Sequence, residues 1–130
     1  MNIYAGSHPR AQKSLVVGHE FSGEVVIHPT LLPGTKVTAL PLLSCGECES
    51  CKLGHSHVCE SLGLLGIDVA GGMPEYVRVP DDVYPLPNGM PLKKGALVEP
   101  LAVAVHAVRE SSFKPGDSAT VFVQDQLVFW

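Results

Sequence analysis

The chain has 130 residues, 45% of them hydrophobic and 17% charged, and its formal net charge is −4 at pH 7. This length and composition indicate one globular domain with its own core and exclude a disordered chain. The acidic balance, without any run of Lys or Arg, excludes a nucleic-acid or anionic-membrane surface, and no apolar run approaches the roughly 20 residues of a membrane helix. No basic and apolar leader opens the chain, so we expect a cytoplasmic protein whose thiols stay reduced.

Short β-strands separated by turns are the expected body of the fold, because the chain carries 13 glycines and 11 prolines. Residues 15–28 hold two apolar runs on either side of a glycine-containing middle. Residues 33–43 begin at a Pro-Gly turn and then alternate apolar and polar side chains. Both patterns predict strands.

All cysteines of the chain follow within one short segment, in the spacing C-x2-C-x2-C-x7-C. They are Cys45, Cys48, Cys51 and Cys59. Disulfides are one interpretation, but bridges between such near neighbours would close strained loops, and a reducing compartment disfavours them. Four thiolates at about 2.3 Å complete the tetrahedral shell of Zn²⁺ and leave no position for a substrate. The spacing therefore predicts a structural zinc ion, with the chemistry located elsewhere.

Two histidines in the same loop are alternative zinc ligands. Because four thiols are available, we expect His55 and His57 to be solvated loop residues instead. Gly46 and Gly54 allow the backbone to fold around the ion.

After the cysteine loop, a glycine turn in residues 71–80 predicts a strand with Val77 and Val79 on one face, and residues 81–91 predict a loop with short extended pieces. An Ala/Val/Leu-rich stretch then predicts a helix from about Pro100 to Glu110. Its apolar character nearly all round implies burial between two layers.

A turn and an apolar β run follow in residues 114–124, of the kind found in the centre of a parallel sheet.

Five segments occur in the order and at roughly the intervals found in one protein family. They are GHEFSGEVV (18–26), the cysteine loop, GGMPEYV (71–77), EPLAVAVHAV (99–108) and PGDSATVFV (115–123). Over residues 1 to about 123 the chain resembles the catalytic half of medium-chain zinc-dependent alcohol dehydrogenases, closest to the sorbitol/polyol and threonine dehydrogenase branch. The resemblance implies a mainly β fold: a partial GroES-like β-barrel with a zinc-stapled loop lobe, followed by one helix and the first strand of a missing Rossmann domain.

The resemblance also implies boundaries within the chain. We expect a partial GroES-like catalytic domain at 1–95, with the structural-zinc lobe at about 41–62. A linking helix at 96–113 and the truncated start of a Rossmann nucleotide-binding domain at 114–130 would follow.

The family oxidises a secondary alcohol to a ketone by hydride transfer to NAD(P), with a catalytic zinc ion as Lewis acid. The resemblance implies that His19, Glu20 and Glu99 are ligands of that ion. From the residues alone, the pattern favours a hydrogen-bonded barrel histidine at His19 over a metal ligand. For Glu99 it indicates an acid at a helix N-terminus, a role that is compatible with metal binding. Adjacent side chains on a regular strand point to opposite faces, so the His-Glu pair can share an ion only where the backbone bends, as Gly18 allows. His106 is expected to serve packing or an interdomain surface.

Two departures from the family pattern stand at the ends of the chain. The family's remaining catalytic cysteine lies in a Cys-Gly-Ser/Thr-Asp stretch ahead of the segment that matches MNIYAG, and this chain starts at Met1. QDQLVFW stands where a glycine-rich turn would hold the dinucleotide, and no G-x-G-x-x-G occurs in the 130 residues. We therefore expect a chain truncated at both ends, with an incomplete catalytic zinc site and no NAD(P) site.

The resulting prediction is a fragment of a zinc-dependent, NAD(P)-dependent alcohol or polyol dehydrogenase that is inactive as the isolated chain; whether the chain is itself an enzyme stays open. The substrate of the full-length family is a small alcohol or polyol, and the four-cysteine site should hold one zinc ion tightly. Open strand edges and the apolar helix favour self-association. The alternative is a non-catalytic zinc-binding β module with an interaction or structural role.

Overall fold

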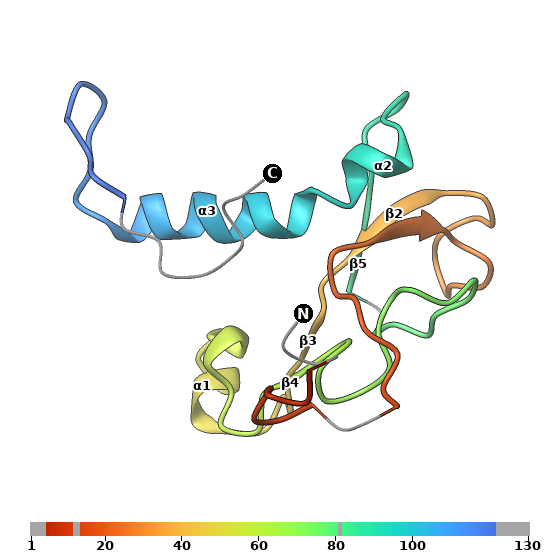
Figure 1. The fold of residues 1–130 in the computed structure, drawn as a ribbon. Helices are drawn as coiled ribbons and strands as arrows, with labels where there is room; N and C mark the ends of the chain where they lie inside the picture. Colours follow the sequence, from red (N-terminus) through yellow and green to blue (C-terminus); the bar gives the residue numbers. More distant parts are fainter. Residues whose placement is uncertain (1–4, 12–13, 81, 122–130) are drawn as a thin grey trace.

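The computed structural model describes residues 5–11, 14–80 and 82–121. Its strands form two small antiparallel sheets, one with the order β1-β2-β5 and one that pairs β3 with β4 (Figure 1). The strands are β1 Ser22–Glu24, β2 Lys36–Ala39, β3 Leu42–Leu43, β4 Gly63–Leu64 and β5 Val83–Pro85. The helices are α1 Glu49–Lys52, the 3-10 turn η1 Ser56–Val58, α2 Leu92–Gly95 and α3 Val98–Glu110. None of these helices has the length and apolar character that crossing a bilayer requires.

Strand β2 is the centre of the larger sheet. Thr38 lies opposite Ser22 of β1 on one side and Tyr84 of β5 on the other. The Thr38 side chain is buried, and its hydroxyl donates to the carbonyl oxygen of Phe21 at 3.1 Å, so this polar group keeps a partner. The chain between β1 and β2 turns at Gly34, which has φ +83°, as the Pro-Gly pattern predicted.

The hydrophobic core is small and lies along β2 and near the two ends of the cysteine lobe. Its buried members are Val25, Val37, Ala39, Pro41, Cys59 and Leu65. Helix α2 packs against the sheet, where the Ser22 hydroxyl donates to the Leu92 carbonyl oxygen at 2.5 Å. This contact places the start of α3 beside the sheet.

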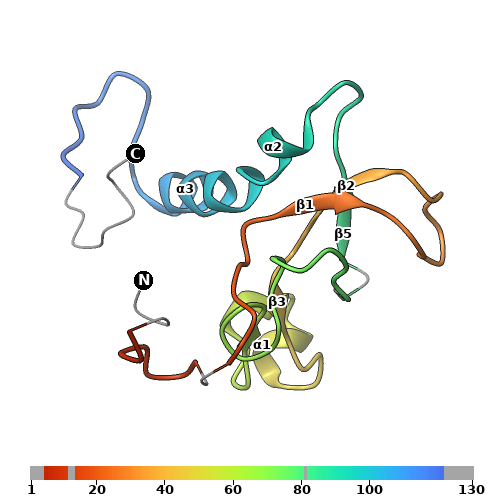
Figure 2. The same cartoon turned by 45° about the vertical axis from the view of Figure 1, so that its right-hand side comes forward.

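Helix α3 confirms the predicted helix, although it begins two residues earlier, at Val98. Its predicted burial between two layers is wrong, since Leu101 is 62% exposed and Val108 is 55% exposed. In Figures 1 and 2 α3 leads away from the sheet, and no described element packs along it. The sequence shows which surface a helix can bury, but not whether a partner layer is present.

Residues 71–80 form no strand, contrary to the prediction. Pro74 has no N–H to donate to a ladder, and the preceding backbone pairs with another segment. Gly71 donates to the Val16 carbonyl oxygen and Gly72 to the Gly18 carbonyl oxygen, each at 2.8 Å. These two hydrogen bonds hold residues 71–72 against the segment just before His19.

Strand content is also lower than predicted in two other segments. Within residues 15–28 only Ser22–Glu24 is a strand. After the turn in which Asp117 N–H donates to the Lys114 carbonyl oxygen at 3.0 Å, residues 118–121 are irregular. The rest of the expected first Rossmann strand lies outside the described residues.

Candidate metal centres

The four cysteines converge in a lobe that leaves the smaller sheet at β3 and returns at β4. One sulfur from each cysteine takes part, and the four sulfurs all lie within 4.8 Å of one another. The Cys45 and Cys59 sulfurs are 3.5 Å apart, those of Cys48 and Cys59 3.9 Å, and those of Cys45 and Cys51 4.0 Å. Ligands at about 2.3 Å from a tetrahedral Zn²⁺ are about 3.8 Å from one another. The free thiols are therefore already spaced as zinc ligands, and none of them is in a disulfide.

Backbone geometry explains why this loop gathers its sulfurs. Gly46 and Gly54 take φ values of +73° and +85°, which allow tight turns on either side of α1. The amides of Glu47 and Cys48 donate to the Cys45 sulfur at 3.4 and 3.3 Å. These N–H groups lower the pKa of Cys45 to about 6 and so favour the thiolate that binds metal.

The pKa values of two other cysteines, Cys51 and Cys59, shift in opposite directions. Desolvation, with a further contribution from the neighbouring Cys48 thiol, raises the pKa of Cys51 to about 12. The amide of Cys45 donates to the Cys59 sulfur at 3.3 Å and is the main cause of a lowered pKa of Cys59. The lobe itself thus favours the thiolate form of Cys45 and Cys59. A bound cation would favour the thiolate form of the other two cysteines as well.

A second group brings together the residues implied as catalytic-zinc ligands. His19, Glu20 and Glu99 each offer one ligand atom, and these atoms all lie within 4.8 Å of one another. Glu99 comes from the first turn of α3, whereas the His-Glu pair follows Gly18, whose φ of +101° produces the required bend. His19 and Glu99 are half-buried and Glu20 is exposed. The ligand atoms of the adjacent residues His19 and Glu20 therefore lie close to one centre, as a shared metal ion would require.

Electrostatics at this second group suits a cation. Burial raises the pKa of Glu99; His19 partly offsets this increase and Glu20 adds to it. One imidazole and two carboxylates would balance the charge of a divalent ion and leave a coordination position open, as catalytic zinc sites do. The residues present at both groups thus fit the metal that the family pattern implies.

Three glycines pack closely around the His-Glu bend and support the candidate site, a role that the sequence patterns did not reveal. A Cβ on Gly66 would lie 2.6 Å from the Gly18 amide nitrogen, and a Cβ on Gly71 would overlap the Gly18 carbonyl oxygen. A Cβ on Gly72 would overlap the Phe21 ring. The sequence pattern at Gly71 and Gly72 predicts only a turn. The close approach of two backbone segments that are distant in sequence has no local sequence pattern.

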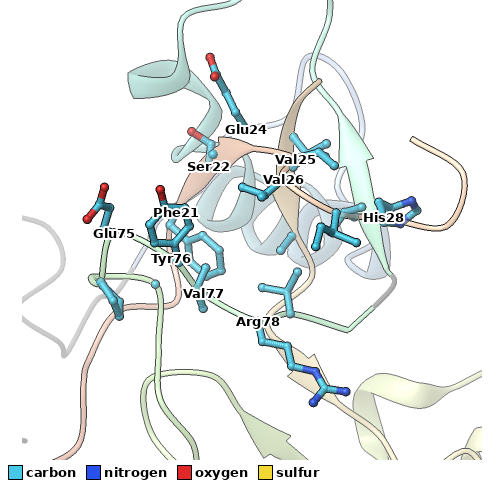
Figure 3. A pocket seen from close by; sticks show the side chains of 18 residues that line it. Phe21, Ser22, Glu24, Val25, Val26, His28, Glu75, Tyr76, Val77 and Arg78 are labelled. Atoms are coloured by element: carbon cyan, nitrogen blue, oxygen red, sulfur yellow. The ribbon is translucent and has the colours of Figure 1, made fainter. Parts of the chain in front are cut away.

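A hollow of about 690 Å³ lies between β1, β2 and residues 74–79. Figure 3 shows Phe21, Val25 and Val77 lining it, while the charged ends of Glu24 and Arg78 point away from it. None of the three ligand candidates of the second group lines this hollow. It offers apolar walls and is separate from both metal groups.

Comparison with known proteins gives a consistent family. The alcohol dehydrogenase GroES-like domain matches residues 1–88. The 2-dehydro-3-deoxy-L-galactonate 5-dehydrogenase of Pseudoalteromonas atlantica is 40% identical over 127 residues, which are 93% of this chain and 37% of that relative.

Solved structures agree. A Sinorhizobium meliloti protein described as a zinc-binding dehydrogenase, bound to NADP, has a TM-score of 0.79 at 35% identity, covering 87% of this chain and 34% of that one. Galactitol-1-phosphate dehydrogenase from Escherichia coli has a TM-score of 0.73 at 32% identity, with coverages of 83% and 33%. The chain thus spans only about a third of the length of these proteins.

Proposed function

Because the chain belongs to the family of alcohol dehydrogenase GroES-like domains, we propose that it supplies the metal-binding catalytic portion of a zinc- and NAD(P)-dependent dehydrogenase. The proposed reaction oxidises a secondary alcohol to a ketone by hydride transfer. A polyhydroxy substrate is favoured, since one relative is named for a galactonate derivative and one structural neighbour for galactitol phosphate. We further propose the division into a catalytic domain at 1–95 with its zinc lobe at about 41–62, a linking helix at 96–113 and the start of a nucleotide-binding domain at 114–130.

The observation that carries this proposal is the convergence of His19, Glu20 and Glu99 across 80 positions of sequence. A zinc ion held by these side chains would act as a Lewis acid on the substrate oxygen. His19 would contribute a neutral imidazole, and the two carboxylates would neutralise the ion's charge. Because the pKa of Glu99 is raised by burial, its proton competes with the cation, and binding should weaken as the pH falls.

The lobe is proposed to hold a structural zinc ion only. Four sulfurs close its coordination shell, so no position remains for a substrate. The isolated 130-residue polypeptide is proposed to be inactive, because its sequence contains no G-x-G-x-x-G motif of the kind that binds a dinucleotide.

Cobalt titration tests the second centre. The purified protein should retain about one zinc per chain after dialysis, held by the four cysteines. Co²⁺ added to this protein should give visible d–d bands without sulfur-to-cobalt charge transfer, and a polyol such as sorbitol should perturb those bands. We expect His19→Ala and Glu99→Gln each to weaken Co²⁺ binding by at least about tenfold, since even indirect partners of metal ligands matter that much.

His28→Ala provides the matched control for this titration. His28 accepts amide hydrogen bonds from Thr30 and Leu31 at 3.1 Å and belongs to neither metal group. Its removal should leave the cobalt bands intact. Cobalt bands that still respond to sorbitol in both ligand variants would contradict the proposed site. Two zinc ions retained after dialysis would contradict the expected weak binding at this site and show that it holds zinc tightly.

A further inference from the structure

Three histidines outside both metal groups lie side by side, although they come from different parts of the chain. His55 and His57 belong to the cysteine lobe, and His106 belongs to the second half of α3. The ring centroids of His55 and His57 are 6.0 Å apart, and those of His57 and His106 are 5.5 Å apart. The expected roles of solvated loop residues and of a packing histidine do not account for this cluster.

The cluster is a contact between two elements that otherwise stay apart. In Figures 1 and 2 the ribbon of α3 passes clear of the lobe, and no described element packs along α3. His57 and His106 therefore reach across the space between them. Among the described residues, none of the three imidazoles has a hydrogen-bond or ion-pair partner, and all three side chains are exposed. Their ring nitrogens are available to a ligand from solvent.

The ring spacing suits a shared cation. Two imidazoles bound to one ion at a Zn–N distance of about 2.0–2.1 Å have ring centroids about 5–6 Å apart. The observed 5.5 Å and 6.0 Å match that separation. The nitrogens are less gathered than the ligand atoms of the two groups above, but exposed side chains change rotamer within picoseconds to nanoseconds. Binding therefore requires the rings to turn their nitrogens toward a common centre.

We propose that His57 and His106, with His55 as a third ligand, form a separate binding site for a borderline divalent cation such as Zn²⁺ or Ni²⁺. Imidazole-only sites suit these ions, whereas the thiolate lobe selects zinc. The bound ion joins the lobe to α3, the helix whose first turn carries Glu99. The site is thus a metal-dependent clamp that fixes the direction of α3, and it does not depend on the proposed dehydrogenase activity.

Calorimetric titration with Ni²⁺ tests the clamp. The zinc-loaded protein carries His19→Ala in every arm, so that the second metal group does not contribute. Into this background His57→Ala, His106→Ala and the control His28→Ala are introduced separately. Because two linked ligands bind far more tightly than one, His57→Ala and His106→Ala should each weaken Ni²⁺ binding by about 100-fold, while His28→Ala leaves it unchanged.

The clamp predicts that substitution of either His57 in the lobe or His106 in α3 weakens the same Ni²⁺ binding. Ni²⁺ binding that resists His106→Ala would mean that the loop histidines act alone and would overturn the clamp. Retention of one zinc per chain in each variant reports an intact lobe. If His57→Ala loses its zinc, His106→Ala, which lies outside the lobe, decides the outcome by itself.

Discussion

The cysteines of the lobe differ from one another before any metal binds. Cys45 accepts two amide hydrogen bonds and is exposed, whereas Cys51 is partly desolvated and has sulfur neighbours. The pKa of Cys45 is lowered to about 6 and that of Cys51 is raised to about 12. At neutral pH the first is therefore largely a thiolate and the second almost wholly a thiol.

This difference predicts an order of alkylation. In metal-free, reduced protein at pH 7, iodoacetamide should modify Cys45 first and Cys51 last, with initial rates that differ by at least about tenfold, because the thiolate is the nucleophile. Peptide mapping by mass spectrometry over time measures the rates. Zinc-loaded protein is the control, in which all four sulfurs should be protected. Equal rates at the two positions would show that the amide hydrogen bonds do not hold in solution.

The candidate metal ligands could be named from the sequence, but the glycine contacts that position them could not. Cysteine spacing identifies a four-sulfur site because the ligands are local, and the structure brings those sulfurs together. Assigning His19, Glu20 and Glu99 to one centre needed the family resemblance. Glu99 is far from the other two in the sequence, and only the fold brings them together. Their roles as ligands remain predictions.

At the scale of elements, prediction succeeded where the signal was local. The Pro-Gly turn at Gly34 and the helix ending at Glu110 are present. The strand at 71–80 is absent because its first residues donate hydrogen bonds to residues 16–18, a long-range pairing that alternation of side chains does not encode. The same alternation still holds in burial, since Val77 and Val79 are half-buried and Arg78 is exposed.

Pairing of residues 71–73 with 16–18 predicts the effect of one added methyl group. Gly71→Ala would push against the Gly18 carbonyl oxygen and displace the bend before His19. We expect a loss of about 1–3 kcal/mol in the free energy of unfolding, as for other overpacked sites, together with weaker Co²⁺ binding at the second centre. Urea unfolding and the cobalt bands measure these two effects.

The control for that substitution is Gly23→Ala in β1. No heavy atom lies within 4 Å of its added Cβ, and its φ is not positive, so both readouts should stay near those of the unsubstituted protein. The zinc lobe should keep its ion in both variants. Loss of zinc along with cobalt in Gly71→Ala would indicate general unfolding and not a displaced bend.

At the scale of the whole molecule, the amount of exposed surface is the main feature. The chain exposes 10461 Å² for a mass of 13.8 kDa. A compact monomer of that mass exposes about 6,600 Å². The excess includes apolar side chains of α3, and β1 is an edge strand of its sheet with one side unpaired in the described residues. Exposed apolar side chains and an open strand edge favour association with another surface.

Self-association follows for the isolated polypeptide. Leu101, Val105 and Val108 lie four and three residues apart, on one face of α3, and are 62%, 41% and 55% exposed. We expect the sedimentation coefficient to rise with protein concentration, because this stripe can pack against a second copy. The double substitution Leu101→Lys/Val105→Lys should make the coefficient independent of concentration.

The control for this double substitution is Val103→Lys, on the opposite face of α3 and 61% exposed. It should leave the concentration dependence in place, because it adds charge without touching the stripe. If Val103→Lys abolishes association equally, net charge and not the α3 stripe controls it; a polypeptide that stays monomeric at every concentration would refute the expectation outright.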